Sequence, residues 1–120
     1  MKIPGPDHPI TLTSSPARWR ATFQGAVIAD SVDVVILAEA AYPPVVYFPR
    51  ADVDMTRLTP TPRSTHCPYK GDAGYFSIAG EGPSGDNAVW TYETPYPTMA
   101  QIAGRLAFYA DRVTISVVEN

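Results

Sequence analysis

Residues 65–71 (T-H-C-P-Y-K-G) bring together the chain's single cysteine, one of its two histidines and a lysine. The proline presets the backbone φ of a turn, and the final glycine allows conformations closed to other residues. Lys70 could stabilise a Cys67 thiolate, and His66 is a candidate base. Reactive side chains on a stiffened turn indicate a site. The alternative is that Cys67 is a small buried hydrophobe and Lys70 a solvated charge.

A structural zinc site is not expected. Such a site needs about four Cys or His ligands, and the supply is limited to Cys67, His66 and His8. Because His66 and Cys67 are adjacent, they would face opposite sides of a strand. We therefore expect the protein to fold without a metal or any other cofactor.

Asp52 and Asp54 form an acidic D-x-D pair. In many phosphate-transferring enzymes such a pair holds a divalent cation against phosphate oxygens, and Arg50 and Arg57 could contact the anion. The Gly-Ser loop typical of nucleotidyltransferases is absent, and residues 47–49 (Y-F-P) stand in its place. Metal-assisted phosphoryl or nucleotidyl transfer and an ordinary turn with a surface ion pair both remain open.

Aromatic residues form the remaining candidate site. Trp90 and Tyr92 lie two positions apart, so they share one face of a regular strand. Tyrosine combines a flat apolar ring with a polar tip, which suits a planar or cationic small molecule. The same rings could equally form core. We expect Tyr75 to be buried with Trp90, and Tyr47, Tyr69 and Tyr92 to lie at a rim.

Length and composition indicate one folded domain spanning residues 1–120. The chain is 45% hydrophobic and 18% charged, and its net charge of −3 argues against nucleic-acid binding. One cysteine is typical of a reducing compartment. Residues 1–16 lack a leader pattern, and the apolar run 32–42 is too short to cross a bilayer. We expect a cytoplasmic protein without a membrane partner.

Short apolar runs between prolines and glycines predict strands. Alternation over 18–23, followed by Gln24-Gly25 and the apolar run 26–29, predicts a hairpin. Further strands are expected at 34–38, 45–48, 75–79 and 88–92, with a closing hairpin of 106–110 and 113–118. Residues 1–16 are expected to be an irregular lead-in and 50–66 a loop.

Residues 97–105 are the expected site of the one short helix. Thr98 and Gln101 have the spacing of a capping box, and Gly104 can end the helix. The sequence thus predicts a mainly β fold, a small antiparallel two-sheet domain with one helix.

Five segments resemble the bacterial family called domain of unknown function 427, which also carries a nucleotidyltransferase-like label. They are 18–31 (R-W-R-A-T-F-Q-G-A-V-I-A-D-S), 46–53 (V-Y-F-P-R-A-D-V), 65–75 (T-H-C-P-Y-K-G-D-A-G-Y), 88–97 (A-V-W-T-Y-E-T-P-Y-P) and 102–113 (I-A-G-R-L-A-F-Y-A-D-R-V). The resemblance implies a β-tent-like fold, similar to that of methionine sulfoxide reductase B and thalidomide-binding domains. Those relatives often carry paired C-x-x-C zinc ligands, which this chain lacks.

Our leading hypothesis is a domain that binds a small anionic or planar molecule between its sheets. The expected lining is Tyr47, Arg50, Cys67, Lys70, Tyr75, Trp90 and Tyr92. Lys70 and Arg50 would hold an anionic group, and the aromatic residues a planar one. An enzyme acting through Asp52 and Asp54 or through Cys67 is the first alternative. A protein-interaction module, homodimeric through an exposed strand edge, is the second.

Overall fold

The computed structural model describes residues 1–119, as ten strands and four short 3₁₀ helices. The strands are β1 (Ile10–Ser15), β2 (Trp19–Phe23), β3 (Ala26–Ser31), β4 (Val34–Glu39), β5 (Val45–Tyr47), β6 (Leu58–Cys67), β7 (Gly71–Ile78), β8 (Val89–Thr91), β9 (Leu106–Phe108) and β10 (Thr114–Val117). The helices are η1 (Arg50–Asp52), η2 (Met55–Arg57), η3 (Pro83–Gly85) and η4 (Pro97–Ile102).

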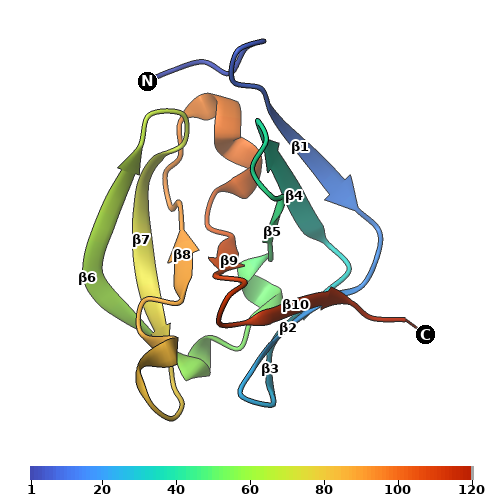
Figure 1. Ribbon diagram of the computed structural model, residues 1–120, viewed down its shortest axis with the longest axis vertical. Helices are drawn as coiled ribbons and strands as arrows, with labels where there is room; N and C mark the ends of the chain where they lie inside the picture. The colour runs from blue at the N-terminus through green and yellow to red at the C-terminus, as the bar shows by residue number, and fades with distance from the viewer. Residues whose placement is uncertain (120) are drawn as a thin grey trace.

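All strand pairs are antiparallel, which confirms the expected mainly β fold. The described strands form three sheets rather than the expected two, in the orders β1-β4-β5, β10-β2-β3 and β6-β7-β8-β9. In Figure 1 the four-stranded sheet stands on the left, β1-β4-β5 faces it on the right, and β10-β2-β3 lies below. Two of the three sheets therefore face each other across the middle of the molecule.

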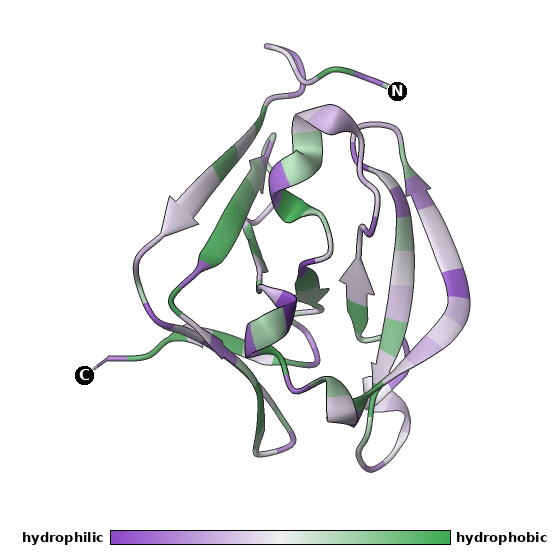
Figure 2. Cartoon of the chain, turned by 180° about the vertical axis from the view of Figure 1, so that it is seen from behind, coloured by the Kyte–Doolittle hydropathy of each residue, from purple (hydrophilic) through white to green (hydrophobic). Residues whose placement is uncertain are grey.

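β4 separates two hydrophobic cores, because its alternate side chains point to opposite faces. Val34 packs into the core around Phe48, whereas Val35 and Leu37 pack into the core around Tyr47. In Figure 2, β4 is almost continuously hydrophobic, while the outer strand β6 is pale or hydrophilic along most of its length. This two-sided burial explains the β-branched run that starts β4.

The hairpin of β2 and β3 is confirmed. Its two turn residues, Gln24 and Gly25, have φ values of 49° and 79°. Two positive φ angles define the turn whose twist matches that of the flanking strands. Ala21 and Phe23, on one face of β2, are buried as the alternation predicts.

The loop expected at 50–66 is wrong from residue 58 onward, where β6 begins. β6 contains Pro60 and Pro62 and pairs only with β7. Proline cannot donate a ladder hydrogen bond, but an edge strand needs donors on one side only. The irregular lead-in is also wrong in part, because residues 10–15 form β1 and pair with β4 in register from Ile10 opposite Glu39.

The expected closing hairpin is wrong. β9 pairs with β8 and β10 pairs with β2, so the two segments belong to different sheets. Alternation within a strand indicates which side chains are buried, but it does not name the neighbouring strand.

η4 occupies residues 97–102 of the expected helix, but its cap differs from the prediction. Tyr96 is the N-cap and makes no side-chain capping bond, while Pro97 begins the helix. Proline suits this first position because its φ is already helical. Gly104 follows with φ 71°, as expected for a residue that ends a helix.

Phe48 joins two sheets. Its backbone N–H donates to the Leu106 carbonyl at 2.8 Å, and the Leu106 N–H donates back at 2.9 Å. This bridge ties the end of β5 to β9 and so fixes the spacing of the two facing sheets. Within residues 1–119, no helix has the length and apolarity needed to span a membrane.

Candidate functional site

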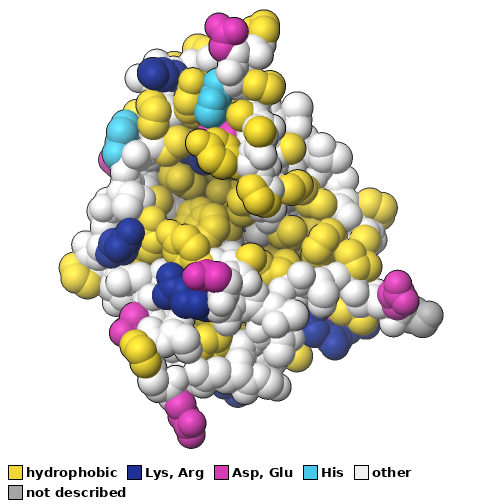
Figure 3. All heavy atoms as spheres, viewed as in Figure 1, with side chains coloured by type: hydrophobic (Ala, Val, Ile, Leu, Met, Phe, Trp, Pro, Cys, Tyr) yellow, Lys and Arg dark blue, Asp and Glu magenta, His cyan; other side chains and the backbone are white. Residues whose placement is uncertain are grey.

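A cavity of about 190 Å³ lies between the facing sheets. In the space-filling view it belongs to a hollow in which hydrophobic side chains gather (Figure 3). β4, β5, β7 and β8, the loop after β4, the turn after β6 and the residues that follow β8 and β9 supply the lining. The lining residues are Leu37, Glu39, Tyr42, Pro43, Val45, Tyr47, Lys70, Tyr75, Trp90, Tyr92 and Tyr109.

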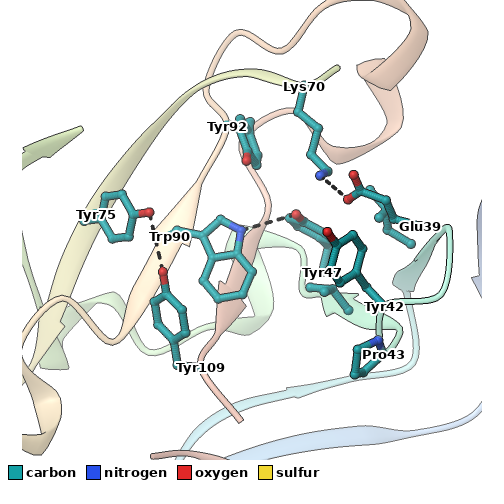
Figure 4. Close-up of a pocket in the computed structure, with 11 residues that line it drawn as sticks. Glu39, Tyr42, Pro43, Tyr47, Lys70, Tyr75, Trp90, Tyr92 and Tyr109 are labelled. Carbon is teal, nitrogen blue, oxygen red and sulfur yellow. Dashed lines mark hydrogen bonds and ion pairs between the residues drawn. The ribbon is translucent and has the colours of Figure 1, made fainter. Parts of the chain in front are cut away.

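Trp90 is the central side chain of the aromatic wall (Figure 4). Its indole N–H donates to the Tyr47 hydroxyl at 3.3 Å, and the two rings meet edge to face with centroids 6.4 Å apart. On its other side the Tyr109 ring lies 4.7 Å away, centroid to centroid. Contacts on both sides hold the indole in one orientation, so a flat ligand would meet a preformed surface.

Tyr92 presents a free hydrogen-bonding group to the cavity. The residue is 7% exposed, and its hydroxyl has no hydrogen-bond partner within residues 1–119. Figure 4 shows that hydroxyl pointing into the cavity. Burial raises the pKa of Tyr92 well above its ordinary value, so the group is a neutral O–H donor at pH 7. No fully buried side-chain N or O within residues 1–119 lacks a hydrogen-bond partner, so the Tyr92 hydroxyl is accessible from the cavity and a ligand acceptor can bond to it.

The Tyr47 and Tyr109 hydroxyls also stay protonated at neutral pH. Burial raises the pKa of Tyr47, and burial together with the Tyr75 hydroxyl raises the pKa of Tyr109 to about 12. Burial raises the pKa of Tyr75, but hydrogen bonds with Thr65 and Tyr109 outweigh burial, so the pKa of Tyr75 lies below its ordinary value. The Tyr75 oxygen lies 2.9 Å from that of Thr65 and 3.5 Å from that of Tyr109.

An ion pair forms the polar end of the cavity. The Lys70 ammonium, on a residue only 8% exposed, donates to Glu39 Oε1 at 2.5 Å. His8 Nε2 lies 2.7 Å from the other carboxylate oxygen of Glu39, and the His8 ring stacks on the ring of Tyr69. Burial raises the pKa of Glu39, but hydrogen bonds from Lys70 and His8 outweigh it and hold the pKa below its ordinary value. Glu39 is therefore a carboxylate at neutral pH, and its charge offsets that of the Lys70 ammonium beside it.

The turn before β7 fixes where Lys70 points. Gly71 has φ 109°, a conformation that L side chains rarely adopt. The Lys70 carbonyl accepts a hydrogen bond from the Tyr96 N–H at 3.0 Å. The backbone that follows Lys70 is thus held in place, and the Lys70 side chain enters the cavity beside Glu39 (Figure 4).

Comparison of the sequence with protein-family models places the chain in a family. A family model described as a domain of unknown function (DUF427) matches residues 11–119. The chain belongs to this family. No curated protein matches the sequence of this chain.

The DUF427 domain brings five of the seven predicted ligand-binding residues to the cavity: Tyr47, Lys70, Tyr75, Trp90 and Tyr92. Tyr75 is buried as expected, and Trp90 is half-buried. The expected rim position is wrong for Tyr47 and Tyr92, which are 1% and 7% exposed, because both belong to the core cluster behind the cavity. That these residues bind a ligand stays a prediction.

Arg50 does not line the cavity. It pairs with Glu93, donates to the Gly104 carbonyl at 3.2 Å and lies 5.8 Å from the centre of the Phe76 ring. These contacts place its charge away from Lys70, so the expected anion clamp of two cations is not formed.

Cys67 lies behind Lys70, with its sulfur 3.7 Å from the ammonium nitrogen. It packs against the core cluster, half-buried, and is not part of the cavity lining. His66 points outward, where its ring nitrogen lies 2.7 Å from Asp72. The candidate base is therefore committed to the opposite face of the strand. This geometry favours the packing role of Cys67.

Asp52 and Asp54 make separate local contacts. Asp52 accepts a hydrogen bond from the Ser31 hydroxyl at 2.6 Å, and Asp54 caps η2 by accepting from the Thr56 N–H at 3.2 Å. Asp54 also pairs with Arg57 at 3.5 Å. Within residues 1–119, no group of three or more His, Cys, Asp or Glu side chains is arranged to hold a metal ion.

Sequence reasoning missed several lining residues, among them Glu39, Tyr42, Pro43 and Tyr109. A signal existed for Glu39, because it shares a strand face with Val35 and Leu37. An acidic residue in line with two buried aliphatic ones predicts a buried charge with a partner. The other three come from loops, whose positions alternation does not encode.

Proposed function

We propose that this domain binds a small planar molecule whose edge carries hydrogen-bonding groups. The observation that carries the proposal is the Tyr92 hydroxyl, unpaired and pointing into an aromatic-walled cavity. Preformed apolar walls with a few convergent polar groups are typical of ligand sites. Flat rings stack on such walls, and the polar groups select their orientation.

The ion pair favours a planar ligand over the anionic one that the sequence also allowed. Because Lys70 already bonds to Glu39, a second carboxylate would compete for a charge that is neutralised. The pair nevertheless retains spare hydrogen-bonding capacity, since an ammonium has three donors and a carboxylate about four acceptor positions. A ring or amide edge with a C=O beside an N–H complements this combination.

Fluorescence of Trp90 tests the proposal. In a Trp19→Phe background, where Trp90 is the remaining tryptophan, we expect benzamide and uracil to change the emission saturably and benzoate to bind more weakly. Tyr92→Phe removes one hydroxyl and should weaken binding about three- to tenfold, the size of one net hydrogen bond.

Tyr96→Phe is the matched control, because Tyr96 packs beside His66 and does not line the cavity. It should leave the affinity for benzamide unchanged. Equal affinities for all three probes in the parent and in Tyr92→Phe would count against a ligand site, as would tighter binding of benzoate than of benzamide.

A further inference from the structure

A second hollow adjoins the cavity at the end away from Lys70. It encloses about 660 Å³ between β4, β5, β9 and the pair β2-β10. Its wall includes Trp19, Ile36, Phe108 and Ile115, and none of its lining residues carries a charge. We call it the apolar groove. Its chemistry differs from that of the cavity, which ends in an ion pair.

The cavity and the apolar groove adjoin each other. Five residues line both of them: Tyr42, Pro43, Val45, Trp90 and Tyr109. Figure 4 shows Lys70 and Tyr92 at one end of the cavity and Tyr109 and Pro43 at the other. A molecule bound against Lys70 can therefore extend past Trp90 into the groove without leaving the protein surface. Figure 3 shows the hydrophobic side chains continuing across the same face.

The sizes of the two spaces indicate which part of a ligand each would take. Ligand pockets usually enclose about 300–1,000 Å³, so the 190 Å³ cavity is small for a complete ligand and the 660 Å³ groove is not. Building on the proposed function, we propose that the ligand is amphipathic: a flat polar head occupies the cavity, and an apolar tail of the same molecule lies in the groove.

An apolar tail fits the groove better than a polypeptide does. A peptide segment would bring backbone N–H and C=O groups into a wall whose side-chain hydrogen-bonding groups are few, among them the hydroxyls of Tyr42 and Tyr109. Burying those backbone groups without partners costs free energy, whereas an alkyl or aryl tail has none to satisfy. The position of the groove next to the polar cavity, with five lining residues in common, further favours one molecule over a separate partner.

A homologous series of probes tests the proposal. Benzamide supplies a flat head with a C=O beside an N–H, and 4-butylbenzamide adds four carbons in line with the ring. Burial of each carbon should strengthen binding about fourfold, so we expect 4-butylbenzamide to bind about 200-fold more tightly than benzamide when all four carbons are buried. Calorimetric titration of the full chain measures both affinities.

Ala110→Glu places a carboxylate in the groove at an exposed position, so the fold should tolerate it. It should reduce the advantage of 4-butylbenzamide over benzamide at least tenfold. Ala103→Glu is the matched control, because Ala103 is also exposed and lines neither space. It should leave the affinity advantage of 4-butylbenzamide over benzamide unchanged. This outcome distinguishes an effect of the carboxylate in the groove from an effect of the added net charge.

The possible outcomes separate this inference from the proposed function. If both probes bind equally and Tyr92→Phe weakens both, the cavity binds a head but the tail proposal is overturned. If neither probe binds, both proposals fail. A tail-dependent gain that Tyr92→Phe leaves intact would mean that the groove acts alone, against the inference. A dimer in sedimentation that Ala110→Glu dissociates would assign the groove to a second copy and also overturn it.

Discussion

Phe48→Ala should lower the free energy of unfolding by about 3–5 kcal/mol, the usual cost of truncating a fully buried phenylalanine. Phe48 is 0% exposed and packs edge to face against Phe108, with ring centroids 5.6 Å apart. Its backbone also bridges two sheets through Leu106. The cavity left by the missing ring would lie where β5 meets β9, so the surrounding strands could collapse into it only by moving both sheets.

Urea unfolding followed by circular dichroism measures this loss, provided the slope against urea stays constant. Phe76→Ala is the matched control, since it removes the same ring from a half-buried position of β7. We expect it to cost less than half as much. Equal losses for the two variants would show that the complete burial of the Phe48 ring adds nothing to the cost of removing it.

The short elements of this fold could be read from sequence because alternation and turn chemistry are local properties. β2 and β3 follow from alternating side chains around Gln24-Gly25, and the end of η4 follows from Gly104. β6 could not be read in this way, because its prolines are compatible with a strand only at a sheet edge. The pairing of β10 with β2 likewise depends on contacts between distant segments.

The cavity illustrates the same limit. The sequence predicts Lys70, Trp90 and Tyr92 as site residues because charged and aromatic side chains of these kinds commonly bind ligands. Arg50 has an equally suitable side chain, but its backbone lies on η1, where Glu93 and the Gly104 carbonyl are nearer partners. Which of several suitable residues share a cavity depends on strand order, and strand order is set by pairing across the whole chain.

Lys70→Met should lower the free energy of unfolding at pH 7 by about 2–3 kcal/mol. Removing one partner of a fully buried ion pair costs about 3–5 kcal/mol, because the other charge stays buried without compensation. The Lys70 and Glu39 side chains are 10% and 16% exposed, so water screens part of this cost. The variant leaves Glu39 with His8 as its remaining side-chain partner.

A double-mutant cycle with Glu39→Gln separates the pair from the packing of the lysine stem. The double variant should be more stable than the sum of the two single losses predicts. Arg18→Met is the matched control, because it breaks a solvent-screened pair with Asp30 at 2.8 Å and should cost much less than Lys70→Met. Additive losses at Lys70 and Glu39 would contradict a coupled pair.

The stability difference between the parent and Lys70→Met should depend on pH. Burial raises the pKa of Glu39, yet the hydrogen bonds from Lys70 and His8 hold it below the ordinary 4.5. A lowered pKa in the folded state stabilises the fold above pH 4.5, and this contribution is lost as the pH falls through the folded value.

In Lys70→Met, one of the hydrogen bonds that oppose the effect of burial is missing, so the pKa of Glu39 should rise. Urea unfolding from pH 7 to pH 3 should therefore show the parent and Lys70→Met converging as Glu39 is protonated. A stability difference that stays constant over this range would mean that Lys70 stabilises the fold through its methylene stem, with no contribution from its charge.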